Sequence, residues 1–101
     1  MDVETMLNKI NDEIPLDIAV IDLMNINTLS TGETVVDVTY PMLSDDLNET
    51  LCFSKDMGPK DVLIHLEELV KEKYTNHKDD AYIIDKMNEF LSIIKKELQQ
   101  M

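Results

Sequence analysis

The chain has 101 residues, the length of one domain that can bury a single core. It carries 21 acidic residues against nine lysines and no arginine, a formal net charge of -12. This balance argues against direct binding to nucleic acid and to anionic membrane surfaces, both of which need a basic surface. Aromatic residues make up 5% of the chain and Trp is absent. Few side chains are therefore available to stack on nucleic-acid bases or on carbohydrate rings.

The negative charge is concentrated in the first half of the chain. Residues 1–50 hold 11 acids and one lysine, whereas residues 51–101 hold 10 acids and eight lysines. Solubility alone does not require so uneven a distribution of charge along the chain, so the sequence favours a one-sided acidic binding face.

The cysteine count and the N-terminus predict the cellular compartment. Cys52 is alone, which excludes an intramolecular disulfide and fits a reducing environment. The segment from Met1 to Glu4 lacks the basic and apolar regions of a secretory signal, and no apolar run reaches transmembrane length. We therefore expect a cytoplasmic protein.

The first half of the chain predicts one helix followed by three strands. The helix begins after Asp2 and ends before Pro15, with an apolar stripe at Val3, Met6, Leu7, Ile10 and Ile14. The first strand is predicted over 16–24, with Leu16, Ile18 and Val20 toward the core and a break in the alternation at Asp22.

The stretch 33–40 alternates most regularly. Val36, Val38 and Tyr40 share one face, with Thr34 at its edge, and Glu33, Val35, Asp37 and Thr39 share the other. The turn residues at 25–32 predict a hairpin between the first two strands. A second turn at 44–48 precedes a short strand at 50–54, with Leu51 and Phe53 facing inward.

Two helices complete the chain. One runs over 59–74, with Pro59 in its first turn and a broad apolar stripe that ends at Tyr74. The other is capped by Asp79 or Asp80 and ends near Gln99. The fold class is therefore α+β: an N-terminal helix, a three-stranded antiparallel meander, and two C-terminal helices packed as an antiparallel pair on one face of the sheet.

This arrangement leaves the other sheet face uncovered, and the acidic first half of the chain supplies its side chains. Thr39, Thr50 and Cys52 join the carboxylates there. The residues that we expect to contact a partner are Asp17, Asp22, Glu33, Asp37, Asp45, Asp46 and Glu49.

The residues needed for catalysis or metal binding are scarce. Cys52 has only His65 and His77 as candidate bases, and neither histidine has the spacing of a zinc ligand. The acidic turn at 44–49 lacks the glycine and the terminal glutamate of a calcium loop. Two glycines, Gly32 and Gly58, cannot form a glycine-rich phosphate loop. We expect no enzyme activity, cofactor or metal.

In topology and charge, this order of a helix, three strands and two helices resembles that of certain small acidic phage inhibitors of Cas9. The resemblance transfers no individual residues. It implies an anti-CRISPR-like inhibitor, from a phage or mobile element, that occupies a basic, nucleic-acid-binding surface of a bacterial protein as a DNA mimic. The alternative is a homodimeric adaptor or chaperone-like module that associates through Tyr82 and Ile93 and uses its acidity for solubility. A small enzyme or ligand binder with a pocket between sheet and helices is a third hypothesis.

Overall fold

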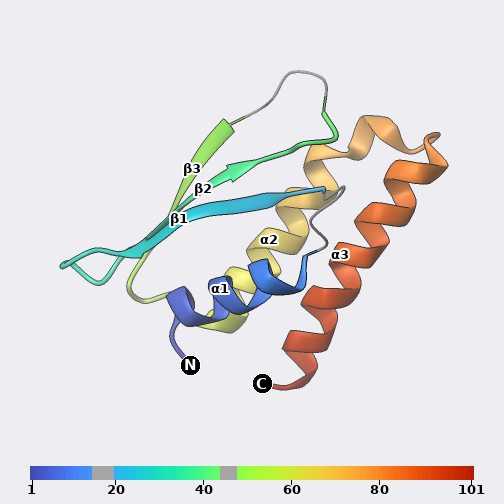
Figure 1. The fold of residues 1–101 in the computed structure, drawn as a ribbon. Coiled ribbons are helices and arrows are strands. Elements are labelled where there is room, and N and C mark those ends of the chain that lie inside the picture. The colour runs from blue at the N-terminus through green and yellow to red at the C-terminus, as the bar shows by residue number, and fades with distance from the viewer. Residues whose placement is uncertain (15–19, 44–47) are drawn as a thin grey trace.

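The computed structural model describes residues 1–14, 20–43 and 48–101. Helix α1 (Val3–Glu13) is followed by strands β1 (Asp22–Thr28), β2 (Thr34–Thr39) and β3 (Asn48–Phe53). Helix α2 (Pro59–Lys73), a short 3₁₀ turn (Thr75–His77) and helix α3 (Ala81–Gln99) complete the chain (Figure 1). The predicted α+β class and order of elements are confirmed.

The strands form one antiparallel sheet in the order β1-β2-β3, which is the predicted meander. The alternation in β2 is also confirmed, because Thr34, Val36, Val38 and Tyr40 are buried. Their side chains, together with Phe53 of β3, face the helices.

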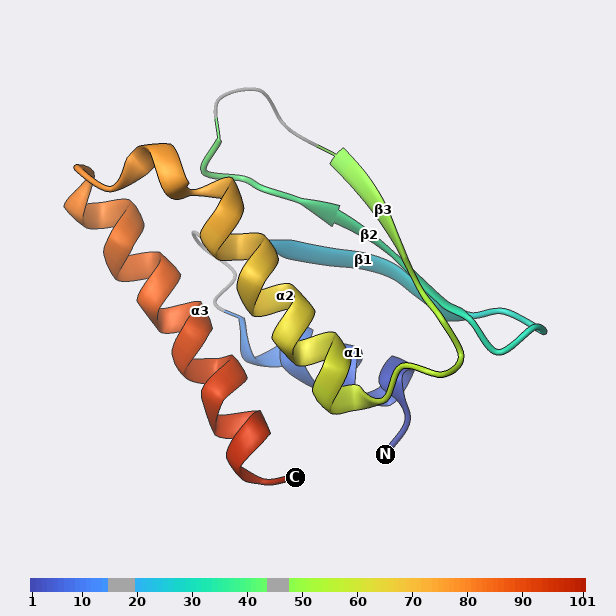
Figure 2. The same ribbon diagram turned by 180° about the vertical axis from the view of Figure 1, so that it is seen from behind.

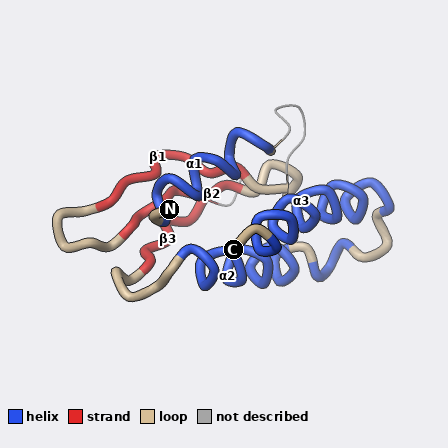
Figure 3. Tube along the Cα trace, turned by 90° about the horizontal axis from the view of Figure 1, so that it is seen from below, coloured by secondary structure: helices blue, strands red, loops and turns tan. Residues whose placement is uncertain are grey.

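The helices all lie on the same side of the sheet. Seen from below, α1 runs beside β1 and α2 beside β3 (Figure 3). Helix α3 packs against α1 and α2, antiparallel to α2, on the side away from the strands (Figure 2). The two C-terminal helices therefore form the predicted pair, but α1 and α2 together make the layer next to the sheet.

The first strand is displaced from its predicted position. The prediction covered 16–24, whereas β1 runs from Asp22 to Thr28, and 15–19 lies outside the described residues. The polar segment 25–28, expected in the hairpin turn, is part of β1. Asparagine is depleted in strands and favours turns, but pairing with β2 outweighs this local preference.

A β-bulge explains how this polar segment enters the sheet. Asn25 and Ile26 interrupt the register between Met24 and Asn27, and Asn25 adopts a positive φ of 53°. Asparagine tolerates this left-handed conformation better than most residues do. The bulge therefore begins three residues beyond Asp22, the residue at which the sequence showed a break in the alternation.

The core is aliphatic. Met6, Leu7 and Ile10 of α1 pack with the inward residues of the sheet and with the stripe of α2. Asp2 caps α1 by accepting a hydrogen bond from the Thr5 N–H at 2.7 Å, and Asp80 caps α3. These caps and stripes position the helices beneath the sheet, and none of the described helices covers its other face.

Candidate functional site

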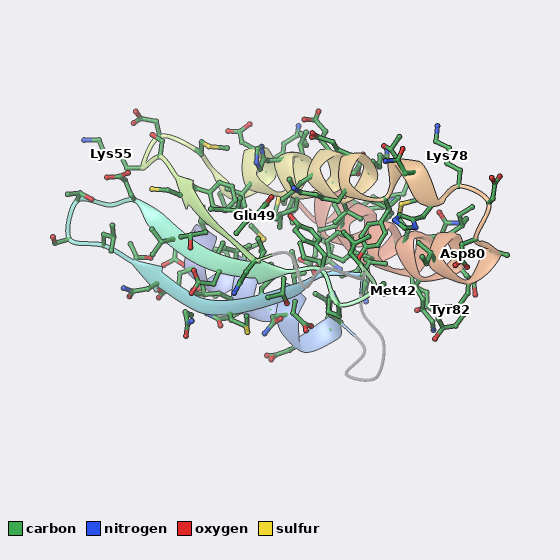
Figure 4. The ribbon with its side chains drawn as sticks, turned by 90° about the horizontal axis from the view of Figure 1, so that it is seen from above. Met42, Glu49, Lys55, Lys78, Asp80 and Tyr82 are labelled. Carbon is green, nitrogen blue, oxygen red and sulfur yellow. The ribbon has the colours of Figure 1, made fainter. Side chains whose placement is uncertain are left out.

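The sheet surface opposite the helices is the candidate site, and we call it the open face. The strand register places its side chains in three rows that cross the sheet, with one residue from each strand in each row. The rows are Asp22, Thr39 and Asn48; Met24, Asp37 and Thr50; and Asn27, Val35 and Cys52. Figure 4 looks down on this face.

Asp37 lies at the centre of the open face and both of its carboxylate oxygens accept hydrogen bonds. The Asn25 Nδ2 donates to Oδ2 at 2.8 Å, and the Thr50 hydroxyl donates to Oδ1 at 2.7 Å. These bonds, first the one from Asn25 and then the one from Thr50, lower the pKa of Asp37 below its ordinary value. The carboxylate is therefore fixed in orientation and stays charged.

Glu33 continues the acidic character beyond the third row, just before β2 begins. Its Oε1 accepts a hydrogen bond from the Thr31 hydroxyl at 3.1 Å, and its Oε2 accepts one from the Cys52 thiol at 3.1 Å. The Glu33 carboxylate raises the pKa of Cys52 by accepting this hydrogen bond. The thiol is thereby held in its less nucleophilic, protonated form.

Asp22 supplies the third described carboxylate, at the start of β1, where its side chain is exposed opposite Thr39. The structure thus brings Asp22, Glu33 and Asp37 onto the predicted face. Asp17, Asp45 and Asp46 lie outside the described residues.

Glu49 lies on the other side of the sheet from these three residues. It is opposite the buried Val38, and its carboxylate forms an ion pair with Lys73 of α2. The Tyr40 hydroxyl also donates to Glu49 Oε2 at 3.0 Å. Lys73 lowers the pKa of Glu49, and burial raises the pKa of Tyr40. Glu49 therefore joins β3 to α2, and Figure 4 shows it where these elements approach.

Asn25 is a site residue that the sequence analysis missed. Its amide reaches Asp37 because the bulge turns it toward the open face. Asn25 and Asn27, on either side of Ile26, were the sequence signal for the bulge, because asparagine is enriched at positive φ. We interpreted them as part of a hairpin turn.

The two histidines considered as catalytic bases, His65 and His77, lie beside aromatic rings. The His65 ring meets the Phe53 ring edge-on, with centroids 5.7 Å apart, and the His77 ring lies 6.1 Å from that of Tyr74. Within the described residues, no group of three or more His, Cys, Asp or Glu side chains is arranged to hold a metal ion.

A hollow of about 470 Å³ lies away from the open face, at the ends of the helices. Its wall includes Lys9, Lys60 and Glu97. The buried Glu97 carboxylate is 3.1 Å from Lys9 Nζ through Oε1, and accepts a hydrogen bond from it through Oε2 at 3.2 Å. This ion pair joins α1 to α3.

The chain matches no protein-family model, and searches of curated proteins and of solved structures give no match. In the described parts of the chain, no helix has both the length and the apolar character needed to cross a bilayer.

Proposed function

We propose that this chain is a non-enzymatic protein-binding module whose open face docks on a basic, nucleic-acid-binding surface of a target protein. One observation carries the proposal. The open face presents Asp22, Glu33 and Asp37, while none of the three strands contains a lysine or arginine. A basic partner thus meets carboxylates without a competing positive charge on the strands.

The hydrogen bonds at the centre of this face support tight rather than diffuse binding. Asp37 is held by Asn25 and Thr50 before any partner arrives, so little side-chain freedom is lost on docking. A carboxylate with two acceptor oxygens suits a bidentate contact with an arginine guanidinium. The surrounding amide and hydroxyl groups can form neutral hydrogen bonds at the rim.

The spacing of the carboxylates limits how closely the face can imitate nucleic acid. Glu33 and Asp37 are four residues apart along extended backbone, which is about 13 Å. A nucleic-acid strand carries a charge about every 3.4 Å along the helix axis. The open face would therefore cover selected basic residues of its target, and would not reproduce a whole row of phosphates.

Inhibition follows if those basic residues ordinarily hold nucleic acid. This is the role implied by the resemblance to acidic phage inhibitors of Cas9. It would place the protein in the cytoplasm of an infected bacterium.

A capture experiment tests the proposal. Tagged protein is exposed to bacterial lysate at about 0.1 M and about 1 M salt, between which the Debye length falls from about 10 Å to about 3 Å. We expect a nucleic-acid-binding protein that is retained at the lower salt, released at the higher, and displaced by its own nucleic acid. Retention that is unaffected by salt and by nucleic acid would contradict the proposal.

Self-association through α3 is the second candidate function, and the exposure of Tyr82 favours it. Tyr82 is 49% exposed, with Lys86 Nζ 5.6 Å from its ring centroid. Ile93, the other residue expected at such an interface, is half-buried and packs against the core. Sedimentation of wild-type protein and a Tyr82→Ser variant tests this: a dimer that the substitution dissociates would favour the adaptor hypothesis.

A further inference from the structure

The two outer strands of the sheet, β1 and β3, differ in how their outer edges are protected. The edge of β1 carries the bulge at Asn25 and Ile26, which breaks the regular ladder. Helix α1 packs against this strand, and Glu4 Oε1 accepts a hydrogen bond from the Thr28 N–H at 2.8 Å. These features are typical of an edge that is closed to further pairing.

Within the described part of the chain, the edge of β3 lacks such protection. Asn48 to Phe53 pair one-to-one with β2 without a bulge, and β3 contains neither lysine nor proline. Across residues 1–14, 20–43 and 48–101, no strand pairs with the outer side of β3. An inward-pointing charged side chain can protect an edge strand from further pairing, and Glu49 points inward. Its carboxylate, however, is already bound by Lys73 and Tyr40. The unprotected segment is therefore Thr50–Phe53, which we call the free edge.

The surroundings of the free edge favour a basic, extended partner segment. On the helix side it adjoins α2, where His65 contacts Phe53 and helical spacing places Glu68 and Glu72 on the same flank. Leu51 is half-buried on that side and can receive an apolar side chain. On the other side, Thr50 of the free edge lies opposite Asp37 of β2.

We propose that the free edge binds an extended segment of the target protein as a fourth, edge-on strand, in which apolar and basic residues alternate. Its apolar side chains lie over Leu51, while its basic side chains lie over the open face. Asp37 is two strand spacings, about 10 Å, from the added strand, a distance that a lysine or arginine can largely span. Main-chain hydrogen bonds supply affinity and the alternating side chains supply specificity. A second copy of this chain is a poor occupant, because each copy carries a net charge of -12.

This inference rests on the proposed function, since it gives the partner of the open face a second point of attachment. The probe is a short fluorescent peptide of alternating lysine and valine, prepared in three forms: unmodified, N-methylated at every valine, and N-methylated at every lysine. In a strand, alternate N–H groups point to opposite edges, so only one methylated set faces β3 whichever way the peptide runs. We expect one methylated peptide to bind at least about tenfold more weakly than the unmodified peptide, and the other to bind nearly as well.

The pattern of binding decides the proposal. Equal binding by all three peptides would show attraction by charge alone and would overturn strand addition, as would equal weakening by both methylations or no binding of the unmodified peptide. A wild-type dimer whose protected amides lie in β3 would also overturn it, because the edge would be occupied by a second copy.

A variant in which Asp22, Glu33 and Asp37 are replaced by Ser separates the two proposals. Loss of peptide affinity in this variant, with no difference between the methylated peptides, would support the acidic face and reject the free edge. Unchanged affinity with a clear difference would support the free edge and reject the acidic face.

Discussion

Asn25 and Asp37 face each other across neighbouring strands, and the Asn25 amide donates a 2.8 Å hydrogen bond to the Asp37 carboxylate. Asn25 can do this only because it occupies the β-bulge with a positive φ. A local distortion of β1 thus orients the central carboxylate of the open face.

Replacing Asn25 separates its backbone role from its side-chain role. We expect Asn25→Ala to destabilise the fold by about 1–2 kcal/mol, because alanine is strained in the left-handed region, and Asn25→Gly to cost less. Both variants should raise the pKa of Asp37 toward its ordinary value, since both remove the amide donor. Urea unfolding measures the first effect and NMR titration of the carboxyl carbon the second. An unchanged pKa of Asp37 in Asn25→Gly would show that the hydrogen bond does not hold the carboxylate.

The ion pair between Glu49 and Lys73 should make stability depend on pH. The folded state lowers the pKa of Glu49, so the stabilisation is present above the unfolded-state value and is lost as the pH falls through the folded-state value. Because the pair is partly exposed, we expect a contribution of at most about 1 kcal/mol. Unfolding of wild type and Glu49→Gln between neutral and acidic pH measures it. The two curves should converge in acid, and a constant difference would contradict this assignment.

The Cys52 thiol should react slowly with alkylating reagents. Its hydrogen bond to Glu33 raises its pKa, and the thiolate is the reactive form. Glu33→Gln should lower that pKa toward its usual value and increase the alkylation rate at mildly alkaline pH. The rate is measured across pH, with Asp22→Asn as the control. If Glu33→Gln leaves the pH profile unchanged, Glu33 does not control the thiol.

The buried carboxylate of Glu97 depends on Lys9. Lys9→Met should destabilise the protein by about 1–3 kcal/mol, since it leaves a 2% exposed carboxylate without its cation. Adding Glu97→Met should recover much of that loss, because the charge that needed a partner is removed. Thermal and urea unfolding of the single and double variants form the test. A double variant no more stable than Lys9→Met would indicate that packing dominates at this position.

The spacing of apolar residues and the capping residues were enough to predict the helices and the two faces of β2. The α2 and α3 boundaries agree closely because Pro59 and Asp80 mark their starts. The first strand was displaced because a bulge depends on pairing with β2, which local propensity does not show. Similarly, the third strand was predicted over 50–54 with Glu49 in the preceding acidic turn, whereas β3 begins at Asn48 and includes Glu49. Only the position of Lys73 shows that the Glu49 charge is used inside the fold.

The central claim is that Asp22, Glu33 and Asp37 on the open face bind the basic surface of a target protein. The most direct test measures the affinity of the captured partner for three proteins: wild type, a variant with these three residues replaced by Ser, and a control with Asp12, Asp79 and Asp85 replaced by Ser. The control removes the same charge from exposed positions outside the sheet. We expect the open-face variant to bind at least about tenfold more weakly than the control, corresponding to a loss of about 1.4 kcal/mol, with its fold intact. Equal affinity of the two variants would show that the open face is not the binding surface.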